Sequence, residues 1–418
     1  MDQKKHSVSY ILLDIPVVLL IFLIFIPQFS LLSNYNYLVL TMQIFWFFLA
    51  FLYQPQFFLN KTEGIRTSFV LIGIILCIPL LFDNYLIFNR YVNLVSLVFF
   101  YWFFRFNIIY RGNRFNLRIV YVSIIPILYS SLSTVRVLRD NPYASRLITS
   151  SLEENKDLVA LGVGGYSLIY SVVIILLTIC PVFLILRKLN MSFFRKAVFI
   201  VVFCVLGLLV IYSNFFTALI LTIIGLIFIY AFFKSIRYIG FFVFIGIVYF
   251  IFSNEINLLF IDILLNFLQE DGKSYQRLYE IKNSITFGST TSSVDSRSEV
   301  LEITRNTFFD NPLFGYIINS NYSFDLKNIG QHSTLFDTLA LYGVFFGAVY
   351  FIIIGRPILK IVNVANNLKV KSYAVIVSLV FIVLIGTNNV TISIAYAFYF
   401  LFPTILEFIN IDNYEKGR

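Results

Sequence analysis

Three basic side chains in one polar segment, residues 254–334, are the best candidates for chemistry on an anionic substrate. Arg297 and Arg305 lie eight positions apart, so on a helix they share one broad face. His332 lies near the end of the segment, just before an apolar run. Guanidinium groups bind phosphates through fixed, bidentate hydrogen bonds and stay charged, and a histidine acts as a general base. This combination predicts a site that binds a diphosphate and takes a proton from a hydroxyl.

The residues around Arg297 predict the helix that holds it. Ser296 and Glu299 have the spacing of a capping box, so we expect the helix to begin there. Asn311-Pro312 should end it. Two plainer interpretations stay open: a surface helix whose arginines pair with glutamates 299 and 302, and an interfacial His332 that only forms hydrogen bonds.

Composition places this segment in a membrane protein. Hydrophobic residues make up 59% of the 418 residues, charged residues 13% and aromatic residues 19%, and the mean hydropathy is +0.86. A globular protein carries about a quarter charged residues. We therefore predict an all-α, polytopic integral membrane protein in which residues 1–418 form a single transmembrane domain.

Apolar runs of near-spanning length give about twelve predicted transmembrane helices. The first is too long for the apolar region of a signal peptide and should be retained. The predicted spans are 10–32, 37–59, 67–82, 85–104, 119–135, 166–186, 197–212, 216–233, 238–253, 335–354, 373–389 and 392–409.

The basic residues orient these spans. With the N-terminus inside, Lys and Arg concentrate in the inner segments, and every short outer connection lacks both. We expect a bacterial cytoplasmic membrane protein with both termini in the cytoplasm. The net charge of +9 then reports contact with anionic lipids rather than binding to nucleic acid.

Two long segments should lie on the extracytoplasmic side. The first is 136–165, and the second, 254–334, is the candidate active-site region. The run 256–268 is too short to span and should form an amphipathic helix at the membrane surface.

Other chemistry-bearing residues have plainer explanations. Asp14 and Arg90 fall inside apolar segments, where an ionisable group is a functional candidate. A carboxylate that only reaches the inner membrane interface also explains Asp14. For Arg90 the explanations are a side chain that snorkels to the outer interface and a contact with a lipid phosphate. Gly162-Val163-Gly164-Gly165 follows no strand and lacks the ending of a phosphate loop. With two histidines in the chain, we expect no metal site and no cofactor.

These residues resemble the O-antigen polymerase and O-antigen ligase superfamily (Wzy type), bacterial enzymes that join glycans carried on undecaprenyl diphosphate. The resemblance covers the layout of about twelve spans and, more specifically, residues 297–347. There the order is Arg297, a short helix, Asn311–Gly315, His332 and then Leu341–Gly347. One feature departs from the family: the Ser-Arg pair that many members carry at the outer start of the eighth span is absent from residues 212–217. Arg90, Arg136 and Arg139 are the candidates to take its place.

The resemblance implies a metal-independent glycosyltransferase that polymerises O-antigen or capsule repeat units at the outer face of the membrane. Arg297 and His332 would be catalytic, and Arg305, Arg90, Arg136 and Arg139 would bind substrate. The implied partners are undecaprenyl-diphosphate-linked oligosaccharide, a chain-length regulator and a flippase. The alternatives are a ligase-type transferase and a flippase for the same lipid-linked sugar. A metal-dependent transferase with acidic residues in its first outer loop is disfavoured, because residues 33–36 contain no carboxylate.

Overall fold

The computed structural model is helical throughout the residues that it describes. These residues are 2–59, 66, 69–73, 88–150, 154–185, 193–234, 253–267, 275–276, 278–279, 282–283, 292–316, 333–365 and 367–415. No strand occurs among them, so the all-α prediction is confirmed for this part of the chain.

The N-terminal half contains α1 (Asp2–Phe25), η1 (Pro27–Leu31), α2 (Tyr35–Tyr53), α3 (Pro55–Leu59), α5 (Phe88–Tyr110), α6 (Asn113–Asp140), α7 (Ala144–Ser150), α8 (Lys156–Ala160) and α9 (Tyr166–Ile185). The C-terminal half contains α10 (Phe193–Tyr212), α11 (Phe216–Lys234), α13 (Ser253–Phe267), α15 (Ser292–Asp310), α16 (Thr334–Val364), α17 (Leu368–Thr387), α18 (Ile392–Tyr396), η5 (Ala397–Leu401) and α19 (Phe402–Glu415).

The helices have the dimensions and the surface of membrane spans. Within the described residues, five are long and apolar enough to cross a bilayer: Tyr35–Tyr53, Asn113–Asp140, Thr334–Val364, Leu368–Thr387 and Ile392–Asn410. Five shorter apolar helices accompany them, in α1, α5, α9, α10 and α11. Large apolar side chains are exposed along α2, α11 and α17, including Phe48, Ile227 and Leu379. Exposed apolar surface on this scale suits lipid rather than water, so the protein is a membrane protein.

The number of spans stays a prediction. The predicted spans 67–82 and 238–253 lie almost entirely outside the described residues. The predicted spans 335–354 and 392–409 correspond to more complex elements. The first is part of the 31-residue α16, and the second comprises α18, the π-helical η5 and the start of α19.

The C-terminal span is the centre of the bundle. Every residue from Ser393 to Leu406 is buried, and α18 and η5 contact both α5 and α9. Phe398 stacks on Phe381 of α17 with ring centroids 3.8 Å apart, and the Tyr396 ring lies edge-on to Phe25 of α1 and Phe100 of α5. Aromatic packing therefore joins the C-terminal span to α1, α5 and α17.

The N-terminal helices pack against this centre through aromatic and polar contacts. Trp46 of α2 is fully buried and lies edge-on to Phe99, Phe103 and Phe106 of α5. Next to it, the buried amide of Gln43 donates a 2.9 Å hydrogen bond to Ser96. Such interhelical hydrogen bonds stabilise helix pairs inside a bilayer.

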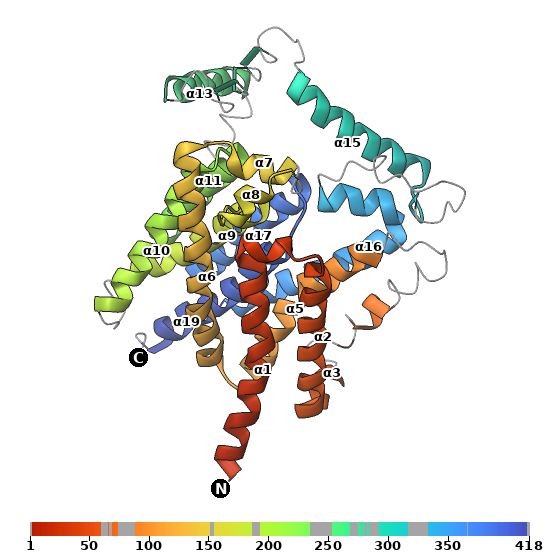
Figure 1. The fold of residues 1–418 in the computed structure, drawn as a ribbon, viewed down its shortest axis with the longest axis vertical. Coiled ribbons are helices and arrows are strands. Elements are labelled where there is room, and N and C mark those ends of the chain that lie inside the picture. The colour runs from red at the N-terminus through yellow and green to blue at the C-terminus, as the bar shows by residue number, and fades with distance from the viewer. Residues whose placement is uncertain are drawn as a thin grey trace.

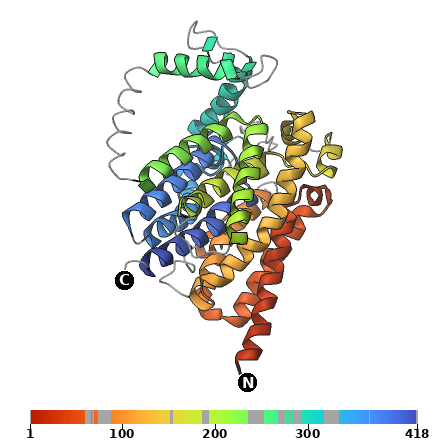
Figure 2. The same cartoon turned by 90° about the vertical axis from the view of Figure 1, so that its left-hand side faces the viewer.

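The two long non-spanning segments lie at the same end of the bundle. Figures 1 and 2 both show the N-terminus at one end and α13 and α15 at the other, and Figure 1 shows α7 and α8 on the side of α13. The helix predicted at 256–268 is observed as α13, which lies crosswise to α1 (Figure 1). Its Ile261 and Leu265 form a small apolar cluster against which Phe216 of α11 packs.

A surface ion pair adds to the α13 cluster. Lys282 lies 2.7 Å from Asp262 of α13, and this hydrogen bond raises the pKa of Lys282.

One helix is longer than its predicted span, and one predicted helix start was wrong. α6 includes residues 136–140, so the predicted long segment 136–165 begins with the last turns of a helix. The helix expected from Ser296 begins at Ser292, so Ser296 is not its cap. Several serines in 292–298 are suitable starting points, and the longer helix places Asp295 in its first turn, where the helix dipole favours an acidic residue. Its predicted end at Asn311-Pro312 is confirmed.

Candidate functional site

The two sequence motifs of the family resemblance meet in space. The turn after α15 (311–316) packs against a break in α16 at Gly343, where the backbone leaves the helical conformation. The break leaves two amides of the second half of α16 without partners in the first half. Val344 N–H donates to Pro312 O at 2.9 Å, and Phe345 N–H donates to Leu313 O at 3.1 Å. Non-helical backbone at membrane depth is tolerated where the protein itself satisfies it.

Glycines at both contact points are required by the geometry. Gly315 has φ +77° and Gly343 has φ +62°, values that favour glycine. A Cβ on Gly315 would lie 2.2 Å from Leu341 O, and a Cβ on Gly343 would lie 2.5 Å from Gly315 N. Because the opposing atoms belong to the backbone, no side-chain movement relieves these contacts. The Pro-Leu-x-Gly turn and the glycine of the next span therefore form one interlocked unit.

A cavity of about 520 Å³ lies beside this unit. It is lined by the C-terminal end of α1, the segment that joins α8 to α9, the first half of α16 and residues 389–393, which include the start of α18. Ligand sites commonly have volumes of about 300–1,000 Å³. Each of these segments except α16 lies far from residues 297–332 in sequence, so the sequence motifs identified only one wall of the cavity.

The start of α16 is fixed firmly at the cavity. Ser333 is buried and caps the helix by accepting a 3.2 Å hydrogen bond from Phe336 N–H. Its hydroxyl also donates to Gly386 O of α17 at 2.7 Å. Thr334 N–H donates to Asn388 O at 3.2 Å, and the Thr334 hydroxyl accepts from Val390 N–H at 2.8 Å. These bonds therefore hold the start of α16, including the cavity-lining Thr334, in one position.

Asp337 brings a carboxylate to the cavity. It lies in the first turn of α16, lines the cavity and is 3% exposed. The sequence analysis did not single it out, although an acidic residue inside an apolar span was the signal that identified Asp14 and Arg90. Thr338 and Tyr342 of α16 and Tyr350 further along it also line the cavity.

Hydrogen bonds tie the opposite wall to the same frame. Tyr166 O–H donates to Asn389 O at 2.9 Å, and Ser393 O–H donates to Ser167 O at 3.0 Å. Gly164 N–H donates to the Thr134 hydroxyl at 2.8 Å. The glycine-rich stretch 162–165 thus packs as the connection between α8 and α9.

The structure describes only in part the predicted catalytic residues, His332 and Arg297, and the predicted substrate-binding residue Arg90. His332 lies outside the described residues, and so do the side chains of Arg297 and Arg90. Their backbone positions place Arg297 in the second turn of α15 and Arg90 in the first turn of α5. Eight residues of helix separate Arg297 from Arg305, which is about 12 Å along the axis.

Three of the arginines predicted to bind substrate are described by the structure, and they lie on the surface. Arg305 is exposed and lies 3.4 Å from the Glu302 carboxylate, which is the surface pair that the plainer interpretation predicted. Arg136 and Arg139 are exposed in the last turns of α6 rather than in a loop. None of these three lines the cavity.

Arg146 is an arginine that the sequence analysis did not propose for this role. It extends from α7 to the start of α11, where its guanidinium donates to Asn214 O and lies 5.4 Å from the Phe215 ring. Asn214 has φ +56° and in turn donates to Pro142 O at 3.1 Å. The stretch that lacks the family's Ser-Arg pair is therefore contacted by an arginine from a segment about 70 residues earlier.

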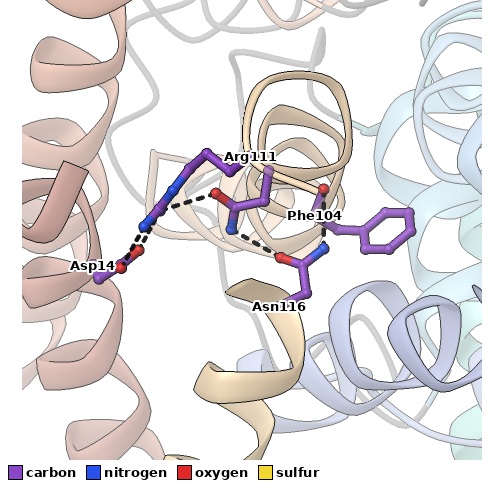
Figure 3. Close-up of polar contacts among 5 residues, drawn as sticks. Asp14, Phe104, Arg111 and Asn116 are labelled. Atoms are coloured by element: carbon purple, nitrogen blue, oxygen red, sulfur yellow. Dashed lines mark hydrogen bonds and ion pairs between the residues drawn. The ribbon is translucent and has the colours of Figure 1, made fainter. Parts of the chain in front are cut away.

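Asp14 has a structural partner at the other end of the bundle. Figure 3 shows its carboxylate facing the guanidinium of Arg111, which donates to both carboxylate oxygens at 2.6 and 2.7 Å. Arg111 also donates to Asn107 at 3.1 Å, and Asn107 donates to Asn116 at 2.8 Å. The network joins α1 to the turn between α5 and α6. Of the two interpretations of Asp14, this contact favours a structural role.

No protein-family model matches the chain, and no curated protein is similar to it. The resemblance to O-antigen polymerases and ligases therefore depends on the residues and their arrangement alone.

Proposed function

We propose that the protein is a polysaccharide polymerase that joins undecaprenyl-diphosphate-linked repeat units at the outer face of the cytoplasmic membrane. One observation carries the proposal: the Pro-Leu-x-Gly turn and the glycine of the following span interlock beside a cavity lined by the first turn of α16. That turn follows His332 directly in the chain. The 17 residues 316–332 and the start of α16 separate the two halves of the family motif in the chain. Their contact in the structure is a physical reason for the two halves to occur together.

The proposed reaction is a glycosyl transfer without a metal. A hydroxyl of the acceptor glycan attacks the anomeric carbon of the donor glycan, and the new glycosidic C–O bond forms as the C–O bond to the diphosphate breaks. His332 takes the hydroxyl proton. The electron pair of the broken bond leaves with undecaprenyl diphosphate, and Arg297 stabilises its charge.

Arginines that the predicted topology puts near the outer face supply further diphosphate contacts in this proposal. Arg305 follows Arg297 on α15, and Arg90 lies in the first turn of α5. Arg146 joins them because it reaches the start of α11, where the resemblance leads one to expect an arginine. Arg136 and Arg139, exposed at the end of α6, are candidates for contact with the glycan or with lipid headgroups.

The arrangement of the long segments supports the proposed sidedness. α7, α8, α13 and α15 lie at the end of the bundle away from the N-terminus (Figure 1). If the basic N-terminal segment is cytoplasmic, all four helices face the outside. That is the side on which a flippase delivers lipid-linked glycans and on which a chain-length regulator would act as a partner.

A lipid-linked oligosaccharide flippase is the second candidate, because one observation favours it. α16 is a broken helix with a buried carboxylate beside a cavity, and discontinuous helices with ionisable groups are typical of transporters. A ligase-type transferase shares the proposed reaction and differs only in its acceptor.

Deletion of the gene in its native host separates the three functions. Loss of a polymerase leaves single repeat units on the carrier or final acceptor. Loss of a ligase accumulates full-length polymer on the carrier, and loss of a flippase traps single units inside the cell. Normal polymer in the deletion strain would falsify the proposal.

Complementation then tests the site. His332→Ala and Arg297→Ala should fail to restore polymer. His6→Ala changes the other histidine of the chain, and Arg114→Ala changes an exposed arginine at the start of α6; both should restore it. Equal restoration by all four variants would show that the assigned residues are not catalytic.

A further inference from the structure

We propose that the turn after α15 inserts into the lipid bilayer as a membrane anchor, through an apolar patch that it shares with α16. The anchor patch consists of Phe309 at the end of α15, Leu313 and Phe314 in the turn, and Val344 and Phe345 just after the break in α16. Its partner is the acyl-chain region of the lipid. The inference does not depend on the proposed function, because it concerns only where the turn lies.

The side chains of the anchor patch are apolar and exposed. Phe309 is 67% exposed, Phe345 is 56% exposed and Leu313 is 55% exposed. Phe314 and Val344 are also exposed. The Phe314 ring stacks on the Phe345 ring with centroids 5.3 Å apart, so the turn and α16 present one continuous surface. Exposed apolar patches mark contacts with lipid or with another protein.

The anchor patch continues the lipid-facing side of α16. Phe345, Ile352 and Leu359 are exposed at intervals of seven residues, which is about two helical turns, so they lie on one side of the helix. Ala348 is exposed between the first two. Because α16 is long and apolar enough to cross a bilayer, this side faces acyl chains. The stacked ring of Phe314 extends the same surface onto the turn, and this continuity makes lipid the expected occupant.

The position of the break along α16 indicates the depth of the turn. The first charged residue after Gly343 is Arg356, and the helix between them is about 20 Å long. The hydrocarbon core of a bilayer is about 30 Å thick. With Arg356 at the cytoplasmic boundary, as the predicted topology has it, the break lies in the outer half of the core. Pro312 O and Leu313 O accept hydrogen bonds from the two residues after the break, so the turn lies at the same depth.

The backbone of the turn suits this depth. Non-helical backbone is tolerated inside a bilayer where the protein satisfies its polar groups. Gly315 N–H donates to Asn311 O at 2.9 Å, and the carbonyls of Pro312 and Leu313 accept from α16. Pro312 has no N–H group to satisfy. The turn therefore enters lipid without exposing these polar groups to it.

Charged residues on α15 limit the insertion. Asp310 is exposed at the end of the helix, and Arg305 and Glu302 form an exposed ion pair before it. In Figure 1, where the longest axis is vertical, α15 rises from the turn toward its N-terminal end. The ion pair therefore lies on the water side of the anchor patch. Interfacial segments bury their apolar face by about 5–10 Å, and an insertion of that size leaves these charges at the level of the headgroups.

Tryptophan fluorescence of the full-length protein in lipid nanodiscs tests this inference. The two tryptophans of the chain, Trp46 and Trp102, are buried, so the wild type gives the background emission. Phe309→Trp and Phe314→Trp each add a probe to the anchor patch and keep an aromatic ring there. The nanodiscs contain either ordinary phosphatidylcholine or phosphatidylcholine brominated in the upper part of one acyl chain. Bromine quenches indoles that contact the chain, and iodide in the buffer quenches indoles that contact water.

The expected result is quenching by lipid and protection from iodide. Both patch variants should lose about half of their added emission in brominated lipid, because insertion by about 5–10 Å places the ring beside the upper acyl carbons. Leu301→Trp, at an exposed position on the water side of α15, is the matched control. Iodide should quench it at least about threefold more than the patch variants. Phe48→Trp on the exposed side of α2 is the lipid-facing control and should respond to brominated lipid.

Two results overturn the proposal. Quenching of the patch variants by iodide as strong as that of Leu301→Trp, without an effect of brominated lipid, puts the turn in water. Quenching by neither agent means that protein, such as a second copy of the chain, covers the anchor patch. If Phe314→Trp disturbs the stacked rings and fails to fold, Phe309→Trp decides the question alone, because Phe309 is the most exposed residue of the patch. None of these measurements requires polymerisation.

Discussion

Replacing Gly343 with alanine should detach the turn after α15 from α16. Gly343 has φ +62° and ψ −169°, a backbone region that is essentially restricted to glycine. The new Cβ would also lie 2.5 Å from Gly315 N and 2.5 Å from the carbonyl atoms of Leu313. Backbone must therefore move on at least one side of the contact.

The expected loss of stability follows from these contacts. Holding an unsuitable residue in this conformation costs about 1–3 kcal/mol. If the turn moves away instead, the hydrogen bonds of Val344 to Pro312 and of Phe345 to Leu313 are lost, at about 0.5–1.5 kcal/mol each. Either response therefore costs about 1–3 kcal/mol. This is a measurable share of a total stability of about 5–15 kcal/mol.

The matched control is Gly355→Ala on the same helix. No atom lies within 4 Å of a Cβ built on Gly355, and alanine is about 1 kcal/mol more favourable than glycine inside a helix. Thermal unfolding in detergent should therefore show a clear decrease for Gly343→Ala and no decrease for Gly355→Ala. Equal unfolding temperatures for the two variants would refute the interlocked turn.

Three further substitutions have distinct expected outcomes in the same unfolding assay. Asp14→Ala leaves the buried Arg111 charge without its carboxylate and should cost about 3–5 kcal/mol, whereas Asp140→Ala at the exposed end of α6 should be neutral. Ser333→Ala removes the cap of α16 and should cost about 0.5–2 kcal/mol; an unchanged midpoint would contradict the cap. Arg305→Gln breaks an exposed ion pair and should change stability by less than about 1 kcal/mol, while polymer from the complemented deletion strain should become shorter.

The sequence predicted elements better than it predicted their ends. Apolar runs identified the helices, because a membrane span depends on the length and apolarity of one continuous stretch of sequence. The start of α15 was misjudged because several serines precede Arg297 and each is an acceptable cap. The end of α6 was misjudged because Arg136 and Arg139 resemble loop residues by charge alone, although the helix continues through them.

The site was predicted less completely, because its geometry depends on distant segments. The family resemblance identified Gly315 and Gly343 as motif positions, but their mutual contact requires a break in an apolar run that no periodicity reveals. Asp337 was overlooked because it falls just inside a span and was counted with it. Its importance appears only when α1, the α8–α9 connection and residues 389–393 are assembled around it.

Long-range polar partners were also beyond the sequence. Asp14 pairs with Arg111 across 97 positions, and Arg146 reaches Asn214 across 68. For Asp14 the sequence showed an ionisable group inside an apolar segment without showing what faces it, and for Arg146 it gave no signal. Helix packing supplies that information, and it changes the interpretation of Asp14 from a candidate for function to a structural contact.

Reconstitution of the reaction tests the central claim most directly. The purified chain in lipid nanodiscs is supplied with the host's undecaprenyl-diphosphate-linked repeat unit, and the products are separated by length. We predict a ladder of glycans on the carrier, with one undecaprenyl diphosphate released for each new linkage, that disappears in His332→Ala and persists in His6→Ala. A folded protein that releases no carrier and makes nothing longer than one repeat unit would contradict the account.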